Sequence, residues 1–205
     1  MDVLAEICLR MDPEDVKSFK STTYEIQYFI EEVEKDEEYW RRKLSRYLGF
    51  EVSQRNEGES WRKMYENVVK AKKDPYKIIE LNYVEILAGL IKEGFDPSAR
   101  DNYAIQSTSK NGHLVVVKLL LQDPRVDLSA DNNYAIRLAS EHGHLEVVKL
   151  LLQDPRVDPS ADDNYAIRGA SDNGHLEVVK LLLQDPRVRN SLSGEELTKY
   201  QKQTK

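Results

Sequence analysis

The chain has 205 residues, of which 32% are charged and 40% are hydrophobic. Acidic side chains outnumber basic ones by 36 to 30, and the resulting net charge of −6 argues against a protein that coats nucleic acid. A single cysteine, Cys8, excludes a disulfide framework and a thiolate-rich metal site. The apolar runs are too short to span a membrane and no secretory leader is apparent, so we expect a cytoplasmic protein that does not enter membranes.

Residues 1–72 carry helical stripes of apolar side chains and no internal repeat, which predicts a small bundle of three or four helices. The last stripe contains Trp40, Leu44, Tyr47 and Leu48. The basic run at 41–46 is expected on the solvated face of this helix, although a basophilic kinase site or a nuclear-import patch would also fit it.

Two motifs in this segment are similar to those of the F-box. Met11-Asp12-Pro13-Glu14-Asp15-Val16 resembles the Leu-Asp-Pro-x-Asp-Leu turn of that family, and Tyr39-Trp40-Arg41-Arg42-Lys43-Leu44 resembles its closing Leu-Trp-Arg-Arg-x-Leu. The opening Leu-Pro is missing, and Thr22 and Ile26 stand where the family has Val and Trp. The resemblance implies docking on the Skp adaptor of a cullin ubiquitin ligase through Val3, Leu4, Ile7, Cys8, Met11, Pro13, Val16 and Phe19. The alternative is that these side chains form the core of the bundle itself.

An all-helical repeat region is expected from residue 73 to residue 205. A degenerate repeat at 73–102 is predicted to form one helix over Pro75–Glu80 and a second that begins near Tyr83. Three near-identical repeats follow at 103–133, 134–164 and 165–189. In these, Tyr103-Ala104-Ile105 returns after 31 residues as Tyr134-Ala135-Ile136 and after another 31 as Tyr165-Ala166-Ile167.

Each repeat is predicted to form two short antiparallel helices. In the middle copy Asn133 is the expected N-cap of a helix over Tyr134–Glu141, which Gly143 ends. A second helix over Leu145–Gln153 places Leu145, Val148, Leu151 and Leu152 on one stripe, and a polar connector over Val157–Asp163 follows Asp154-Pro155. Neither helix can bury its apolar side alone, so the pairs are expected to stack as a solenoid with one continuous core.

The repeat resembles the ankyrin repeat. The run Gly143-His144-Leu145-Glu146-Val147-Val148-Lys149-Leu150-Leu151-Leu152 follows the second-helix pattern of that family almost letter for letter. Each copy is two residues shorter than the usual 33, and we expect the loss to shorten the hairpin finger. An F-box joined to short-fingered ankyrin repeats is similar to proteins of large DNA viruses of amoebae.

The chain is expected to end in a cap at 190–205. Ser193-Gly194-Glu195-Glu196 predicts a capping box that opens a short polar helix to about Gln203. Such a helix would cover the exposed apolar side of the last repeat.

The resemblance to ankyrin proteins implies binding of a protein partner on the concave face of the stack. Positions that differ between copies are the candidates for this contact: Gln106, Ser107, Lys110, Arg137, Leu138, Glu141, His142, Arg168, Gly169 and Asp172. The connectors add Asp127, Leu128, Asp131, Asn132, Asp158, Asp162 and Asp163. The alternative is that these positions drifted after recent duplications and contact nothing.

No catalytic, cofactor-binding or metal-binding residues are predicted, and we do not expect an enzyme. His113, His144 and His175 recur with the fold, which favours a structural hydrogen bond into the neighbouring turn over a metal site. Two functions are compatible with the sequence of this expected monomer. The chain either recruits a target to a ubiquitin ligase as an adaptor, or acts as a stand-alone ankyrin module that sequesters or inhibits its partner.

Overall fold

The computed structural model describes residues 36–71 and 74–204, and every regular element in these ranges is a helix. The chain forms two compact units, Met1–Asp74 and Pro75–Lys205. We call them the N-terminal unit and the C-terminal unit and describe each by itself.

In the N-terminal unit, the described part is a pair of packed helices, α4 (Glu37–Leu48) and α5 (Trp61–Ala71). Helix α4 begins where the Asp36 carboxylate accepts the backbone N–H groups of Glu38 and Tyr39, and it ends at Gly49, whose φ of +87° suits glycine. The core between the helices is aromatic, with the rings of Trp40 and Tyr65 5.4 Å apart.

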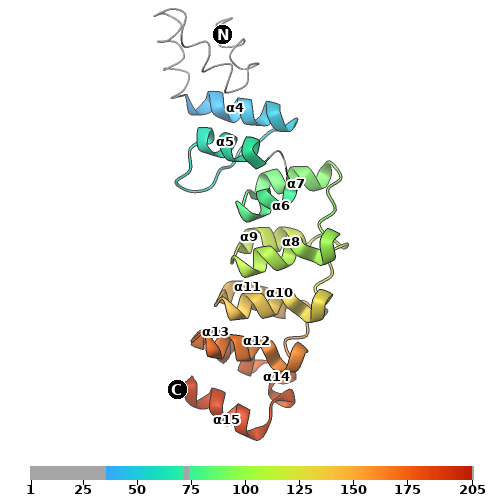
Figure 1. Cartoon of the computed structure of the whole chain (residues 1–205), viewed down its shortest axis with the longest axis vertical. Helices are drawn as coiled ribbons and strands as arrows, with labels where there is room; N and C mark the ends of the chain where they lie inside the picture. Colours follow the sequence, from blue (N-terminus) through green and yellow to red (C-terminus); the bar gives the residue numbers. More distant parts are fainter. Residues whose placement is uncertain (1–35, 72–73, 205) are drawn as a thin grey trace, which may run out of the picture. The chain divides into compact units, whose positions relative to one another are not determined.

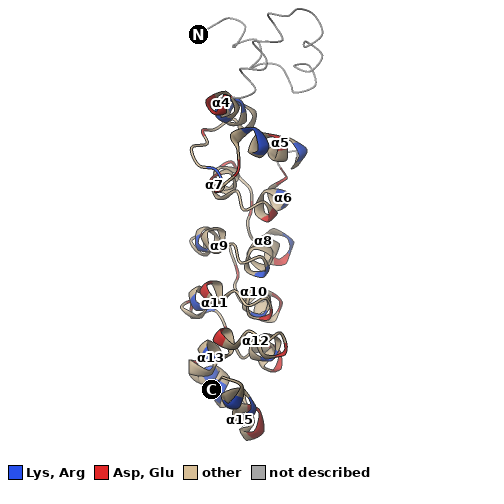
Figure 2. Ribbon diagram, turned by 90° about the vertical axis from the view of Figure 1, so that its left-hand side faces the viewer, with Lys and Arg blue, Asp and Glu red and all other residues tan. Residues whose placement is uncertain are grey.

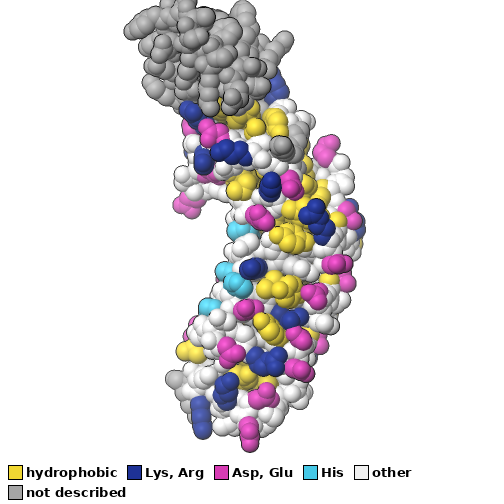
Figure 3. All heavy atoms as spheres, viewed as in Figure 1, with side chains coloured by type: hydrophobic (Ala, Val, Ile, Leu, Met, Phe, Trp, Pro, Cys, Tyr) yellow, Lys and Arg dark blue, Asp and Glu magenta, His cyan; other side chains and the backbone are white. Residues whose placement is uncertain are grey.

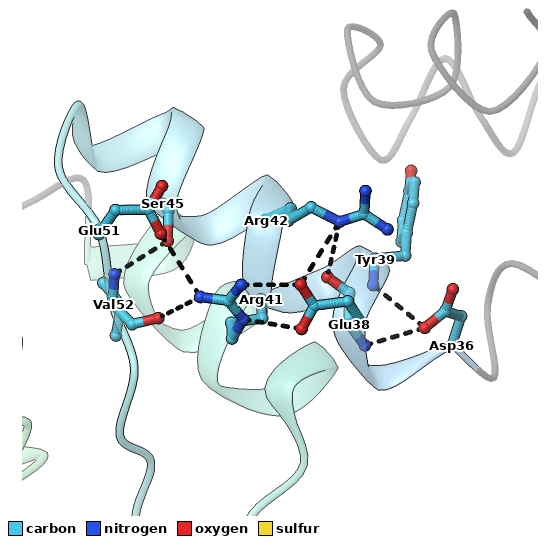
Figure 4. Close-up of polar contacts among 8 residues, drawn as sticks. All are labelled: Asp36, Glu38, Tyr39, Arg41, Arg42, Ser45, Glu51 and Val52. Atoms are coloured by element: carbon cyan, nitrogen blue, oxygen red, sulfur yellow. Dashed lines mark hydrogen bonds and ion pairs between the residues drawn. The ribbon is translucent and has the colours of Figure 1, made fainter. Parts of the chain in front are cut away.

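The basic side chains at the centre of α4 lie partly at the surface and partly in the core. The Arg41 guanidinium pairs with Glu38 and donates to the carbonyl of Val52, which ties the helix to the segment that follows it (Figure 4). Lys43 was expected on the solvated face, but it is only 4% exposed. Its Nζ donates to the Tyr39 hydroxyl and lies 5.3 Å from the centre of the Trp40 ring.

Ser45 is also buried, which removes the kinase-site interpretation of the same run. Its Oγ accepts the Val52 N–H at 3.0 Å, so the hydroxyl is a structural acceptor inside the N-terminal unit.

The C-terminal unit is a stack of helix pairs (Figure 1). Helix α6 (Pro75–Glu80) pairs with α7 (Val84–Lys92), α8 (Ala99–Lys110) with α9 (Leu114–Leu121), α10 (Ala130–Glu141) with α11 (Leu145–Leu152), and α12 (Ala161–Asp172) with α13 (Leu176–Gln184). The first helices α8, α10 and α12 form one column and the second helices α9, α11 and α13 another (Figure 2). The prediction of stacked helical pairs is confirmed.

The core of the C-terminal unit is a seam that runs between these columns. In the repeat at 134–164 it contains Ala135, Ile136 and Ala139 from the first helix, and Val147, Val148 and Leu151 from the second. The predicted stripe of α11 was partly wrong, because Leu145 and Leu152 are only half-buried and Val147 is buried instead. A stacked helix contacts its own partner and the helices of the adjacent repeats, so it buries neighbouring positions rather than one narrow stripe.

The turn that precedes each regular first helix differs from the prediction. Residues 131–133 lie inside the bounds of α10 but have φ between +49° and +59°, and regular helical geometry begins at Tyr134. Asn133 thus directly precedes the regular helix, where the prediction placed it, but its side chain does not cap that helix. Its Oδ1 instead accepts the backbone N–H of Asp158 in the next connector at 2.7 Å.

The same arrangement occurs in the neighbouring repeats. Asn102 accepts the N–H of Asp127 at 2.8 Å, and Asn164 accepts the hydroxyl of Ser191 at 2.6 Å. All three asparagines are buried and left-handed, a conformation that asparagine tolerates better than most residues. We call this set (Asn102, Asn133 and Asn164) the asparagine clasp, because each member precedes a helix pair and binds the segment that follows that pair.

The connectors are short turns with no strand in the described part of the chain, so the shortened finger is not a hairpin. They are also less polar than expected, because Val126, Leu128 and Val157 are buried. The Asp154 carboxylate accepts a hydrogen bond from the Arg156 guanidinium, and this bond lowers the pKa of Asp154. Arg156 Nη1 also donates to the carbonyl of Val126, one repeat earlier. The connectors therefore add polar contacts between repeats.

The C-terminal end is closed by α14 (Pro186–Ser191) and α15 (Gly194–Gln203). The predicted capping box is confirmed, with Ser193 accepting the Glu196 N–H and the Glu196 side chain accepting the Ser193 N–H. Tyr200 is buried, and Ser171 in α12 donates to Gln203 in α15. Helix α15 thus covers the last repeat as the sequence predicted.

Two equivalent glycines have the same backbone geometry but different surroundings. Variants at these positions therefore distinguish the cost of backbone strain from the cost of a clash between repeats. Gly143 and Gly174 both have a φ of +75°, but a Cβ on Gly143 would lie 2.5 Å from Nδ1 of His175, whereas one on Gly174 would meet nothing within 4 Å. We expect Gly174→Ala to cost about 1 kcal/mol of unfolding free energy from strain alone, and Gly143→Ala to cost a further ~1–3 kcal/mol from the clash. Urea unfolding of both variants measures the difference. Equal costs would contradict the stacking described here.

Candidate binding face

The first helices of the C-terminal unit present a row of aromatic side chains, one from each helix. The row comprises Tyr76, Tyr103, Tyr134 and Tyr165, all half-buried, and we call it the tyrosine stripe. Figure 3 shows this face over α6, α8, α10 and α12, with a line of apolar and aromatic side chains flanked by acidic and basic ones. The 31-residue repeat places one tyrosine at the start of each regular first helix from Tyr103 on.

Rings and guanidinium groups contact one another along the stripe. Tyr76 packs edge-on against Tyr103, with ring centres 5.4 Å apart, and the Arg100 guanidinium lies 4.0 Å above the Tyr76 ring. Arg137 lies between two tyrosines, 5.2 Å from the ring centre of Tyr134 and 4.7 Å from that of Tyr165. These distances are within the range of cation–π attraction.

Carboxylates complete the arrangement around Arg137. The guanidinium pairs with Asp162 and donates to the carbonyl of Asp131, and its side chain is only 12% exposed. The Tyr165 hydroxyl donates to Glu141 at 3.0 Å, and this hydrogen bond raises the pKa of the tyrosine. The face is therefore polar and ordered by its own contacts.

Most of the predicted partner-binding residues lie on this face or at its edge. Those at least partly exposed are Gln106, Lys110, Arg137, Glu141, His142, Arg168 and Asp172. Ser107, Leu138 and Gly169 are buried where adjacent first helices pack together, so they offer little surface to a partner.

The connector positions divide in the same way. Asp127, Asp131, Asn132, Asp158, Asp162 and Asp163 are exposed. Leu128 is 1% exposed, so it belongs to the core.

The tyrosines themselves were not among the predicted contacts. They are identical in the three complete repeats, so a search for positions that differ could not find them. The available signal was the spacing of Tyr134 to Arg137 and of Tyr165 to Arg168, because residues three apart share a helix face.

The predicted adaptor-binding residues, from Val3 to Phe19, lie outside the described residues. The part of the closing F-box-like motif from Tyr39 to Leu44 lies within α4, where Trp40 and Leu44 are buried.

The described ranges were also compared with the requirements of a metal site and of a membrane-spanning helix. Across residues 36–71 and 74–204, no three His, Cys, Asp or Glu side chains are grouped so that they could hold a metal ion. Among the helices of those ranges, none has the length and apolar character needed to cross a bilayer.

A comparison with models of protein families matches the C-terminal unit. The model of the family described as "Ankyrin repeats (3 copies)" matches residues 77–163 and, in a second placement, residues 108–191. The two placements together cover more than half of the 205 residues. No curated protein and no solved structure shows a significant match.

The recurring histidines line the turn between the two helices of each repeat. His144 Nε2 contacts the carbonyl of Lys110 at 2.8 Å and His113 Nε2 contacts that of Glu80 at 3.4 Å. A carbonyl only accepts, so in each case Nε2 carries the proton. The prediction of a hydrogen bond into the neighbouring turn is confirmed for both.

Stability should depend on pH through His113. Burial, opposed by the hydrogen bond to Glu80 and reinforced by the nearby His144, lowers the pKa of His113. Below its unfolded pKa of about 6.5 the unfolded chain then binds more protons, so the unfolding free energy should fall as the pH drops below that value. Urea unfolding from neutral to mildly acidic pH measures this loss. His113→Gln, which keeps a donor but does not titrate, should flatten the dependence, and an unchanged slope would contradict the assignment.

Proposed function

Because the chain belongs to the ankyrin repeat family, we propose that its C-terminal unit binds a partner protein through the tyrosine stripe and the charged side chains beside it. The all-helical repeat fold is typical of non-enzymatic binding modules. The observation that supports this surface most directly is the alignment of half-buried tyrosines along successive stacked helices.

The composition of the face suits protein recognition. Tyrosine provides a large contact area at low cost in side-chain entropy, and its hydroxyl can satisfy a polar partner. The charged residues that differ between repeats, such as Lys110, Glu141 and Asp172, occupy the same place at the end of each first helix. They give the repeat at 103–133 a positive charge where the next two repeats have a negative one, which is the kind of difference that selects one partner over another.

We further propose that the N-terminal unit docks on a Skp-type adaptor, so that the chain would recruit its partner to a ubiquitin ligase. The support is the F-box-like pair of motifs at 11–16 and 39–44, together with the formation of α4 by the second of them. Recruitment of this kind acts by raising the local concentration of the target at the enzyme. Without docking, the chain would act as a stand-alone module that sequesters or inhibits its partner.

A capture experiment with paired charge reversals tests the binding face. The variant Lys110→Glu with Asp172→Lys changes the first-helix face without changing the net charge, and Lys118→Glu with Glu177→Lys makes the same exchange on second helices. Proteins captured by the wild-type chain should bind the first variant about tenfold more weakly, because like charges then oppose each other at the interface. The second variant should bind as the wild type does.

Equal loss of binding in both variants, or no loss in either, would contradict the proposed face.

A second part of the same experiment tests the adaptor proposal. A purified Skp-type adaptor should co-elute with the wild-type chain and be lost on Leu4→Asp or Ile7→Asp, while capture through the C-terminal unit persists. Folded wild-type chain that does not bind the adaptor would leave the stand-alone module as the function.

A further inference from the structure

One position in the tyrosine stripe has the surroundings of a guanidinium site but no guanidinium of its own. The template is Arg137, which lies between Tyr134 and Tyr165 and pairs with Asp162. Arg168 also lies 5.9 Å from the ring centre of Tyr165, so the guanidinium groups of Arg137 and Arg168 both contact this ring. Two tyrosines of the stripe, together with an aspartate whose backbone is left-handed, thus hold an arginine of the chain itself.

The repeat at 103–133 reproduces this arrangement with a neutral side chain at its centre. Thirty-one residues earlier, Gln106 stands in the place of Arg137, Tyr103 and Tyr134 in the places of the two rings, and Asp131 in the place of Asp162. Gln106 Nε2 donates to the carbonyl of Asp101 at 2.7 Å, and Arg137 donates to the carbonyl of Asp131, which lies one position earlier in the equivalent left-handed turn. A hydrogen bond to this turn is therefore kept, and the charge is absent.

The repeat at 103–133 therefore lacks the positive charge that Arg137 provides in the next repeat. In the described part of the chain the Asp131 carboxylate forms no ion pair, and the Tyr134 ring is approached by one cation, Arg137. A glutamine is shorter than an arginine, so its amide does not reach the position that the Arg137 guanidinium takes in the next repeat. The exposed carboxylate and the half-buried ring remain accessible beyond that amide.

We propose that this niche, formed by Tyr103, Gln106, Asp131 and Tyr134, binds an arginine side chain of the partner protein. A guanidinium can stack on the Tyr134 ring and pair with the carboxylate at once, as Arg137 does within the chain. A lysine would make the ion pair with weaker stacking, because its ammonium group is compact and strongly hydrated. The inference rests on the proposed function, since it names the chemistry of the partner at that face.

The test titrates the full chain with N-acetyl-arginine amide and follows the Gln106 side-chain amide and the Tyr134 backbone amide by NMR. N-acetyl-citrulline amide has nearly the same shape without the charge, and it should bind about fivefold more weakly or not at all. Gln106→Arg places a guanidinium of the chain in the niche, so it should abolish the response while the unit stays folded.

Two aspartate variants localise the response. Asp131→Asn removes the carboxylate and should weaken binding about fivefold. Asp163→Asn is the matched control, because Asp163 is also exposed and left-handed, and its counterpart in the preceding repeat is already an asparagine, Asn132. This control should respond as the wild type does.

An equal response to citrulline, a response that persists in Gln106→Arg, or no saturable response to arginine would each overturn the proposal. Capture of the partner distinguishes this failure from failure of the proposed function. If Gln106→Arg captures the partner as well as the wild type does, while the charge reversals on the first helices do not, the face binds the partner without the niche.

Discussion

The C-terminal unit depends on the asparagine clasp and the apolar seam that it closes. Each helix pair exposes apolar side chains toward both neighbours, so it is stable only when the next pair lies in register. Asn102 and Asn133 fix that register, because each buried carboxamide accepts a backbone N–H that lies 25 residues later. The left-handed turn around each asparagine has a conformational cost, and the hydrogen bond and the buried seam offset it.

The regular register has a direct functional consequence. Because successive first helices are held alike, their tyrosines form a stripe in which rings and guanidinium groups contact one another in two groups, one around Tyr76 and Tyr103 and one around Tyr134 and Tyr165. Ordering these side chains before binding reduces the entropy lost when a partner docks. Small differences between repeats, such as Gln106 in place of arginine, then change the chemistry of one position without changing the scaffold.

In the C-terminal unit the sequence was sufficient to predict the helix pairs, their stacking and the cap, because these follow from local apolar periodicity, turn residues and the capping box at Ser193. It was insufficient for the left-handed turn before each first helix, because Asp-Asn-Asn is also a normal capping sequence and the asparagine side chain binds the distant N–H of Asp158 instead. The burial of Lys43 depends on rings from two helices, including Tyr65 of α5. The niche at Gln106 became apparent only when the structure showed what surrounds Arg137.

Urea unfolding of two variants at Asn133 tests the clasp most directly. Asn133→Gly removes the acceptor without a conformational penalty, and it should lower the unfolding free energy by about 1–3 kcal/mol because the Asp158 N–H loses its partner. Asn133→Ala should cost a further ~1–2 kcal/mol, because alanine disfavours the left-handed conformation. A glycine variant as stable as the wild type would contradict the account, because the carboxamide would then not be holding the repeats in register.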